Sequence, residues 1–266
     1  MAMKMDSYIV QLKNLIWKGR YKLKGVPWWR DFLVAPTPEM AQTVGGKFGG
    51  LFFEHDGDVV NKWLHYLPIY DALVLPYAGS DVRMLEIGVV SKGGSLALWR
   101  KALGEKATIF GIDIDPKCAE FDGKFATVRI GSQDDAGFLK DVVREMGGVD
   151  IVLDDGSHVA SHERASFETL FPLLSEGGLY IIEDVHTAYW PSFEGGLKRS
   201  GTAIEFMKKQ IDEMHSHYLN KARNTETAIP PIESIQFFDS VVAVRKRKQA
   251  PRQVVNVPHH STGASA

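Results

Sequence analysis

Leu153-Asp154-Asp155-Gly156-Ser157-His158 is the stretch that decides the fold, together with a second acidic stretch, Ile182-Glu183-Asp184-Val185-His186. Each follows a short apolar run, Val149–Leu153 or Leu179–Ile182, with the length and composition of a buried strand. As neighbouring parallel strands, these two runs would end about 5 Å apart. The two acidic turns would then face each other across one gap.

These two turns carry the residue types of a metal site. Carboxylates from two strand ends supply the oxygen ligands that a hard cation prefers, and His158, three residues after Asp155, can serve as a base beside them. Asp and Gly also form ordinary turns, so one such stretch alone would indicate only a turn. Two matched stretches favour a metal site with a catalytic base over two ordinary turns. Asp154 should point away from Asp155, because side chains alternate along a strand, and it is assigned a structural role.

Composition limits the classes of protein that fit. The chain has 266 residues, enough for one large α/β domain with additions or for two small ones. A hydrophobic share of 44% supports a core, and a net charge of −2 gives no reason to expect nucleic acid as a partner. Cys118 is the only cysteine, which excludes an internal disulfide and a thiolate metal cage. No apolar run reaches membrane-spanning length, and Met1–Lys18 lacks a secretion-signal pattern, so we expect a cytoplasmic protein.

Residues 1–58 are predicted to form an accessory arm or lid. Pro36–Pro38 and Gly45–Gly50 predict a break in regular structure. An amphipathic helical pattern precedes Trp28-Trp29. We expect this helix to pack on the main domain or a second subunit, or else to lie on a membrane surface. An exposed apolar stripe of this size favours a homo-oligomer, in which a second subunit covers the stripe, or a segment that covers a substrate pocket. The apolar positions of the pattern are Tyr8, Ile9, Leu12, Leu15 and Ile16.

Residues 59–246 are predicted to form the main domain. From Arg83 onward strand and helix patterns alternate, which predicts an α/β fold with a mostly parallel sheet and helices on both faces. The expected strands are Arg83–Ile87, Thr108–Ile112, Ala126–Ile130, Val149–Leu153, Leu179–Ile182 and a hairpin of Ser234–Phe238 with Val241–Arg245. The expected helices are Asn61–Leu75, Ser95–Leu103, Asp135–Met146, Val159–Leu174 and Thr202–Leu219. The tail, residues 247–266, is predicted to be disordered.

Three successive strand ends carry residues that suit a nucleoside. Glu86-Ile87-Gly88 ends the first strand and Gly93-Gly94-Ser95 opens the next helix, where glycines let a ligand approach the backbone and free N–H groups are available. Gly111–Asp115 ends the second strand, and an acidic side chain there can accept both ribose hydroxyls. Gly131–Asp134 ends the third, at a place suited to contact an adenine edge. The order of these motifs predicts a nucleoside pocket at the carboxyl edge of the sheet.

The glycine spacing differs from that of dinucleotide-binding proteins. Val90 and Lys92 stand where the Gly-x-Gly-x-x-Gly pattern would have small residues, which argues against a Rossmann oxidoreductase. An acidic residue inside the loop also suits a cationic ligand better than a pyrophosphate. The residues predicted to bind the cofactor are Glu86, Gly88, Ser95, Asp113, Asp115, Ser132, Gln133 and Asp154.

Together these features resemble the class I S-adenosylmethionine-dependent methyltransferases, over roughly residues 61–246. The closing hairpin is similar to the signature ending of that Rossmann-like fold, in which an antiparallel seventh strand lies between the fifth and the sixth. A long run of motifs resembles, more narrowly, the metal-dependent sugar O-methyltransferases of macrolide pathways and the cephalosporin-hydroxylase-like group. These motifs are Asp155-Gly156-Ser157-His158, Ser166-Phe167, Leu170-Phe171-Pro172, Gly177–Asp184 and Thr187-Ala188-Tyr189-Trp190.

The resemblance implies S-adenosylmethionine as the cofactor and Mg²⁺ or another divalent cation at the acidic turns. By position, Asp155, Glu183 and Asp184 would hold the ion. His158 would act as the catalytic base, and Asp155 would take part in catalysis as a metal ligand. The implied reaction is natural-product O-methylation at a hydroxyl of a sugar or glycoside. His162 is assigned a supporting role, because the Glu of the zinc motif His-Glu-x-x-His is missing.

Two alternatives stay open at this point. One is a catechol- or phenol-type O-methyltransferase, in which a metal ion also binds neighbouring oxygens of the acceptor. The other is a non-catalytic partner with a methyltransferase fold in a biosynthetic complex. Loss of the base or of a metal carboxylate would mark such a partner, and the sequence retains all of them.

Overall fold

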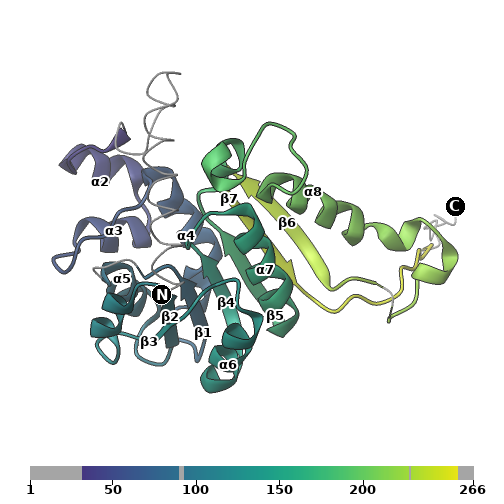
Figure 1. Ribbon diagram of the computed structural model, residues 1–266, viewed down its shortest axis with the longest axis horizontal. Helices are drawn as coiled ribbons and strands as arrows, with labels where there is room; N and C mark the ends of the chain where they lie inside the picture. Colours follow the sequence, from purple (N-terminus) through teal and green to yellow (C-terminus); the bar gives the residue numbers. More distant parts are fainter. Residues whose placement is uncertain (1–31, 90–92, 228, 257–266) are drawn as a thin grey trace, which may run out of the picture.

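The computed structural model describes residues 32–89, 93–227 and 229–256, and a seven-stranded sheet forms its centre (Figure 1). The strand order is β3-β2-β1-β4-β5-β7-β6. The strands are β1 (Arg83–Ile87), β2 (Thr108–Asp113), β3 (Thr127–Ile130), β4 (Val149–Asp154), β5 (Leu174–Ile182), β6 (Ile232–Phe238) and β7 (Val241–Lys246). β1 to β5 run parallel to one another, and β7 runs antiparallel to both β5 and β6. The predicted fold class is therefore confirmed, including the insertion of the last strand between the fifth and the sixth.

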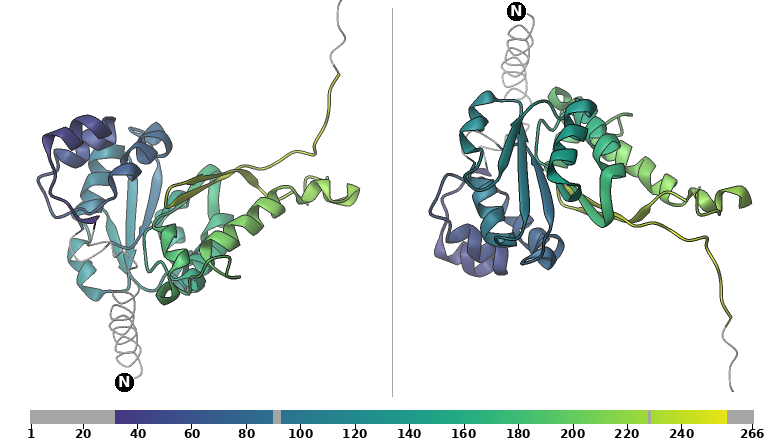
Figure 2. Two further views of the ribbon diagram at one scale, coloured as in Figure 1. Left: turned by 90° about the horizontal axis from the view of Figure 1, so that it is seen from above. Right: turned by 90° about the horizontal axis from the view of Figure 1, so that it is seen from below.

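Helices cover both faces of the sheet (Figure 2). Side chains alternate along each strand, so β1 gives Met84 to one core and Leu85 to the other. The first core contains α3, α4 and α5, and the second contains α6, α7 and α8. The α-helices are α2 (Pro38–Val44), α3 (Lys47–Phe53), α4 (Leu67–Leu73), α5 (Gly94–Leu103), α6 (Ala136–Met146), α7 (Ala160–Leu170) and α8 (Ala203–Met214). Short 3₁₀ helices span Leu64–Tyr66, Leu75–Tyr77, Pro116–Phe121, Phe171–Leu173, Val185–Tyr189, Pro191–Phe193, Ser216–Tyr218 and Lys221–Arg223.

The two breaks in regular structure predicted at Pro36–Pro38 and Gly45–Gly50 are shorter than expected within the segment from 36 to 50. This segment contains α2 and most of α3, because its prolines and glycines start and end helices. Pro38 stands in the first turn of α2, where its missing N–H group is not needed, and Thr37 caps that helix by accepting from Met40 N. Gly45 and Gly46, with φ of 59° and 73°, make the turn between the two helices. The glycines therefore interrupt helical structure at one point only, between α2 and α3.

Several predicted elements are shorter or longer than expected. Of the helix predicted over 61–75, only Leu67–Leu73 is α-helical. The helix predicted over 159–174 ends at Leu170, four residues early. β5 starts at Leu174, five residues earlier than predicted from its apolar run. The predicted amphipathic pattern over 8–16 and the Trp28-Trp29 pair lie outside the described residues. The described part of the tail, residues 247–256, contains no regular secondary structure.

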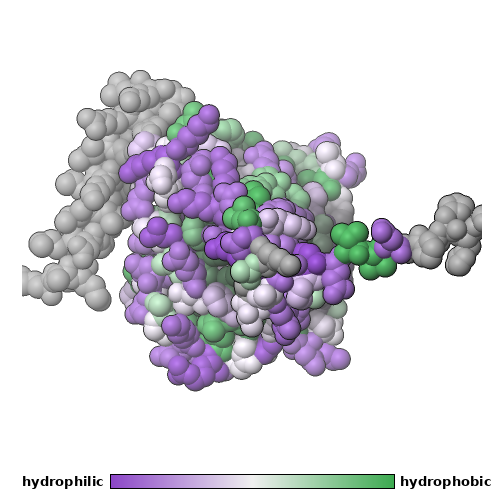
Figure 3. All heavy atoms as spheres, turned by 90° about the vertical axis from the view of Figure 1, so that its right-hand side faces the viewer, coloured by the Kyte–Doolittle hydropathy of each residue, from purple (hydrophilic) through white to green (hydrophobic). Residues whose placement is uncertain are grey.

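The described surface is mixed in character. Figure 3 shows hydrophilic side chains over most of one face, with apolar side chains in scattered patches. Within the described ranges, no helix combines the length and the hydropathy that crossing a bilayer requires.

Candidate active site

β4 and β5 bring the two acidic turns together. Asp154 pairs with Ile182 in the parallel register, and Glu183 N donates to Asp154 O at 3.0 Å, so the chain leaves both strands side by side. Asp155, His158 and Asp184 offer ligand atoms that all lie within 4.8 Å of one another. His158 Nε2 lies 3.7 Å from Asp155 Oδ1 and 3.7 Å from Asp184 Oδ2. We call these three residues the acidic cluster.

Two members of the acidic cluster have an unusual backbone. His158 and Asp184 both have φ of 55°, in the left-handed region that residues other than glycine rarely adopt. Neighbouring segments hold them there: Thr187 N donates to Asp184 O at 2.9 Å, and Thr187 Oγ1 donates to His158 O at 3.4 Å. Such conformations concentrate at active sites, where the surrounding structure imposes them. The two turns thereby direct both side chains to one place.

Glu183 is held differently from the acidic cluster. Its side chain is buried, and Tyr70 OH donates to Glu183 Oε1 at 2.5 Å. Lys62 Nζ donates to Glu183 Oε2 at 2.7 Å and to Asp155 Oδ2 at 2.6 Å. Burial and the charge of Asp155 raise the pKa of Glu183, whereas the Lys62 ammonium lowers it. Both oxygens of Glu183 therefore already have donors from the protein.

A segment that the sequence analysis did not select surrounds these carboxylates. Trp63 Nε1 and Tyr66 OH donate to Asp184 Oδ1 at 3.1 and 2.7 Å, while Asp184 Oδ2 faces His158. We call Lys62, Trp63, Tyr66 and Tyr70 the 62–70 donors. Lys62 and Trp63 precede the 3₁₀ turn Leu64–Tyr66, and Tyr70 lies in α4. Their recurrence about every four residues was a signal in the sequence that these polar groups have partners in the core, but it does not identify the partners.

Asp154 lies on the other side of the strand end. Its buried carboxylate accepts from Gln133 Nε2 at 3.0 Å, Tyr180 OH at 2.9 Å and Ser166 Oγ at 2.5 Å. Gln133 Oε1 in turn accepts from Ser157 N at 2.7 Å. These three contacts are structural, and the assignment of Asp154 to cofactor binding stays a prediction. Gln133, which stays a predicted cofactor residue, joins the end of β3 to the turn after β4 through these two hydrogen bonds.

The predicted cofactor residues of β1 and α5 contact each other. Glu86 is fully buried and accepts from Ser95 Oγ at 2.9 Å and from Trp99 Nε1 at 3.1 Å, which ties α5 to β1. Burial raises the pKa of Glu86 to about 7, against the lowering effect of Lys62. Gly88 has φ of 95°, and a Cβ there would lie 2.1 Å from Asp155 O. Glycine is therefore required for the close approach of the turns after β1 and β4.

The remaining predicted cofactor residues lie at the carboxyl ends of β2 and β3. Asp113 Oδ1 accepts from Asp115 N at 2.8 Å, and Asp115 Oδ1 accepts from Lys117 N at 3.0 Å as the cap of a 3₁₀ helix. Ser132 Oγ donates to Asp134. These side chains are only partly covered. They occupy the same sheet edge as the acidic cluster, on its β1–β3 side, as the nucleoside interpretation requires.

His162 stays outside the acidic cluster. Its Nδ1 lies 3.0 Å from Ser157 Oγ, and its Nε2 lies 3.7 Å from Asp134 Oδ2. His162 therefore contacts the turn that carries His158 and the end of β3. These contacts agree with the supporting role that the sequence assigned to it.

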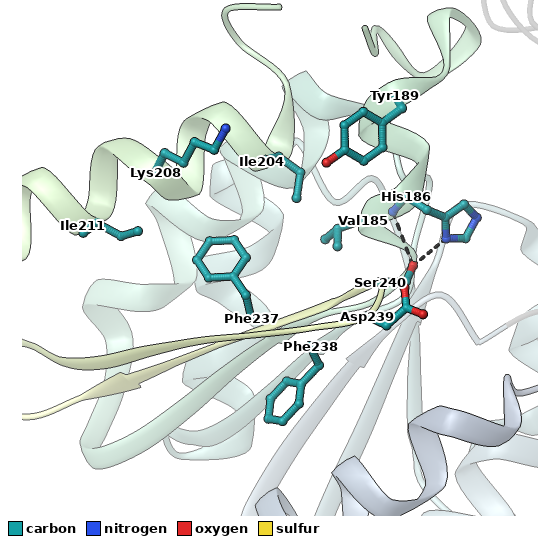
Figure 4. A pocket seen from close by; sticks show the side chains of 10 residues that line it. All are labelled: Val185, His186, Tyr189, Ile204, Lys208, Ile211, Phe237, Phe238, Asp239 and Ser240. Atoms are coloured by element: carbon teal, nitrogen blue, oxygen red, sulfur yellow. Dashed lines mark hydrogen bonds between the residues drawn. The ribbon is translucent and has the colours of Figure 1, made fainter. Parts of the chain in front are cut away.

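A cavity of about 480 Å³ lies next to the acidic cluster on the β7 side (Figure 4). Val185 and His186 line it and directly follow Asp184, so the cavity begins within two residues of the cluster. In Figure 4 Ile204 and Phe237 point into the space between α8 and the β6–β7 hairpin, while Phe238 points to the other side of the hairpin. The lining is mostly apolar.

Aromatic rings stand between the cavity and the acidic cluster. The ring centroid of His186 lies 5.7 Å from that of Trp63 and 4.8 Å from that of Trp190. Phe193 lies 6.4 Å from the ring of His158. Burial lowers the pKa of His186, and its Nδ1 contacts Ser240 Oγ at 2.5 Å. The site thus combines a polar centre with apolar walls.

Comparison with known proteins places this geometry in a family. A family model described as a methyltransferase domain matches residues 85–185. The chain is 39% identical over 179 residues to the 8-demethyl-8-(2-methoxy-α-L-rhamnosyl)-tetracenomycin-C 3'-O-methyltransferase of Streptomyces olivaceus, covering 64% of this chain and 45% of that protein. It is 41% identical over 167 residues to the mycinamicin VI 2''-O-methyltransferase of Micromonospora griseorubida, covering 59% of this chain and 41% of that protein.

A solved structure agrees with these matches. The MycE methyltransferase of the mycinamycin biosynthetic pathway, in complex with Mg, SAH and mycinamycin VI, superposes with a TM-score of 0.64 at 32% identity. The match covers 80% of this chain and 55% of that one. The chain spans about half the length of the curated relatives it matches.

The chain has the fold of the class I S-adenosylmethionine-dependent methyltransferases, and its residues 85–185 match a methyltransferase domain. Within that class it is similar to sugar O-methyltransferases of antibiotic pathways, the group that the sequence motifs indicated.

Proposed function

We propose that this protein is a metal-assisted, S-adenosylmethionine-dependent O-methyltransferase that acts on a sugar hydroxyl of a glycosylated small molecule. The convergence of Asp155, His158 and Asp184 beside the ends of β1–β3 carries this proposal. The names of the relatives support it, since they describe O-methyltransferases of rhamnosyl tetracenomycin and of mycinamicin. The complex of MycE with Mg and SAH supports the choice of donor and metal ion.

The donor atoms of the acidic cluster fit a hard divalent cation. Asp155 Oδ1 and Asp184 Oδ2 both face Nε2 of His158. The other oxygen of Asp155 accepts from Lys62. The other oxygen of Asp184 accepts from Trp63 and Tyr66. Carboxylate oxygens are the protein ligands that Mg²⁺ prefers, with water and substrate in the remaining positions. Glu183 completes the proposed set of ligands. The bound ion would make the acceptor hydroxyl more acidic.

His158 is the proposed base. Its Nε2 faces the gap between Asp155 and Asp184, so a hydroxyl placed there is within reach of this nitrogen. Thr187 and the left-handed backbone set the position from which the His158 side chain leaves the turn. The donor would bind along the ends of β1–β3, where Asp113 and Ser132 can contact its ribose and its base. The methyl group and the hydroxyl would then meet above the carboxyl ends of β1 and β4.

The cavity beside His186 favours a glycoside over a free sugar or a simple catechol. Its apolar lining, with Ile204, Ile211 and Phe237, extends the site well beyond the space that one ring at the acidic cluster needs. Ligand sites in this size range are mostly apolar with a few polar groups that fix orientation. We assign the cavity to the apolar aglycone, with the sugar between the aromatic rings and the acidic cluster.

The experiment is a methyl-transfer assay with labelled donor on a panel of rhamnosides, macrolide glycosides and catechols, with and without a chelator. Asp155→Ala should lose metal-dependent turnover. His158→Ala should keep donor and metal binding but lose about 10²- to 10⁴-fold in rate, the usual contribution of a positioned base. His215→Ala, which changes an exposed histidine after α8, is the matched control and should retain full activity. Full activity of His158→Ala, or indifference of the wild type to chelation, would refute the mechanism.

A further inference from the structure

Lys62 places a positive charge between two of the proposed metal ligands. Its Nζ lies 2.6 Å from Asp155 Oδ2 and 2.7 Å from Glu183 Oε2, and its side chain is 4% exposed. Two carboxylate oxygens at this distance favour the charged form of a lysine over the neutral form that burial alone would favour. Lys62 is therefore a buried ammonium.

The carboxylates need such a counter-charge. Asp155 and Glu183 leave adjacent strand ends, and one oxygen of each contacts the same Lys62 ammonium. Removing one partner of a buried ion pair leaves an uncompensated charge and destabilises the fold. Lys62 supplies the positive charge from the start of the 62–70 donors, and Tyr70 OH fixes the second oxygen of Glu183.

A divalent ion on the same carboxylates would meet this ammonium. Metal–oxygen distances of about 2.1 Å are typical for Mg²⁺, so an ion bound to the oxygens that Lys62 contacts would lie within about 5 Å of Nζ. Two cations at that separation repel each other strongly in a buried site. The ion and the ammonium therefore compete for Asp155 and Glu183.

We propose that Lys62 is an internal cation that competes with the divalent ion, and that Glu183 becomes a metal ligand only when the ammonium leaves it. Lys62 keeps the two carboxylates in position and lowers their affinity for the ion. Metal binding is then an exchange of one cation for another. The inference rests on the proposed function only in assuming that a divalent ion binds at these carboxylates.

The test uses Lys62→Met in the full chain, with two measurements that should move in opposite directions. In a chelator, the melting temperature should fall, because Asp155 and Glu183 lose their counter-charge. In calorimetric titrations with Mg²⁺ and with Mn²⁺, the affinity should rise at least tenfold, and saturating metal should restore the melting temperature. Lys62→Gln keeps a hydrogen-bond donor and should show the same gain in affinity with a smaller loss of stability. Lys101→Met, which removes a solvent-exposed pair with Asp56, should change neither quantity.

Unchanged or weaker metal binding by both Lys62 variants would overturn the proposal, and so would failure of all the proteins to bind either ion. A purely structural lysine would lower the melting temperature without raising the affinity. The methyl-transfer assay decides the proposed function separately. A wild type that binds Mg²⁺ but methylates no acceptor would refute that function and leave the competition by Lys62 standing.

Discussion

Glu163 carries a carboxyl group in a place where a charge is costly. It lies on α7 with 3% of its surface exposed, and its Oε1 has no hydrogen-bond partner among the described residues. Burial, followed by the negative charges of Asp154 and Asp184, raises the pKa of Glu163 well above its usual value. The folded protein therefore keeps a proton on Glu163 at pH values where the unfolded chain has released it.

Replacing Glu163 by Gln should flatten the pH dependence of stability. Because its folded pKa is raised, Glu163 contributes stability that is complete below the unfolded value of about 4.3 and is lost as the pH rises toward the folded value, by about 1.4 kcal/mol per pH unit. Relative to the wild type, the unfolding free energy of Glu163→Gln should therefore rise between pH 5 and pH 8 in denaturant titrations. Glu168→Gln, at an exposed position of the same helix, is the control. Parallel pH profiles of wild type and Glu163→Gln would contradict the prediction.

The sequence predicted some partners of the site and missed others for a physical reason. Asp155, His158 and Asp184 directly follow two apolar runs, so the parallel pairing of β4 and β5 was enough to bring them together. Lys62 contacts Asp155 from 93 positions away in the chain. Composition and spacing describe neighbours within one element and carry no information about such a tertiary pair.

The 62–70 donors form one side of the acidic cluster, and their effect on metal binding can be measured with a single hydroxyl. Tyr66→Phe removes a donor to Asp184 Oδ1 while it keeps the ring in the core. Partners that orient a ligand typically change metal affinity by about 10- to 100-fold, so Mg²⁺ and Mn²⁺ should bind that much more weakly. This sign is opposite to that expected for Lys62→Met, because Tyr66 orients a ligand and carries no charge.

Tyr77→Phe is the matched control for the hydroxyl of Tyr66. Tyr77 OH donates to Gly177 O at 3.1 Å, near the start of β5 and away from its acidic end. Each variant should lose about 1 kcal/mol of stability with its hydrogen bond. Calorimetry should separate them by their metal affinity, and equal affinities would show that Tyr66 has no part in positioning Asp184.

Among the elements, the strands were predicted better than the segments around proline and glycine. β1 has the expected bounds, because an apolar run between polar residues has few other structures open to it. The helices α2 and α3 were missed, because Pro38, Gly45 and Gly46 were taken as breaks where they start or end helices. β5 extends back through Gly177 and Gly178 because pairing with β4 at Val149 overrides the weak strand preference of glycine.

At the scale of the whole molecule, the chain enters the described part next to the acidic cluster. Phe32 has its ring centroid 5.3 Å from that of Trp63, whose indole donates to Asp184. The preceding residues, where the sequence predicts an amphipathic arm, are thus covalently joined to a wall of the site. The residues proposed to bind S-adenosylmethionine, at the ends of β2 and β3, lie on the opposite side of β1 from β4 and β5. The arm and the donor site are therefore separable by experiment.

Deletion of residues 1–31 should change acceptor binding or assembly and leave donor binding intact. Calorimetry with S-adenosylhomocysteine should give the same affinity for the truncated and the full chain. The apparent KM for a glycoside acceptor, or the mass in solution measured by light scattering, should change, because the predicted arm covers the acceptor side or a second subunit. Phe32→Ala in the full chain removes the ring contact with Trp63 and should raise the acceptor KM without changing the mass. Unchanged KM and mass after the deletion would leave the membrane-surface interpretation of the arm, which binding to anionic vesicles tests directly.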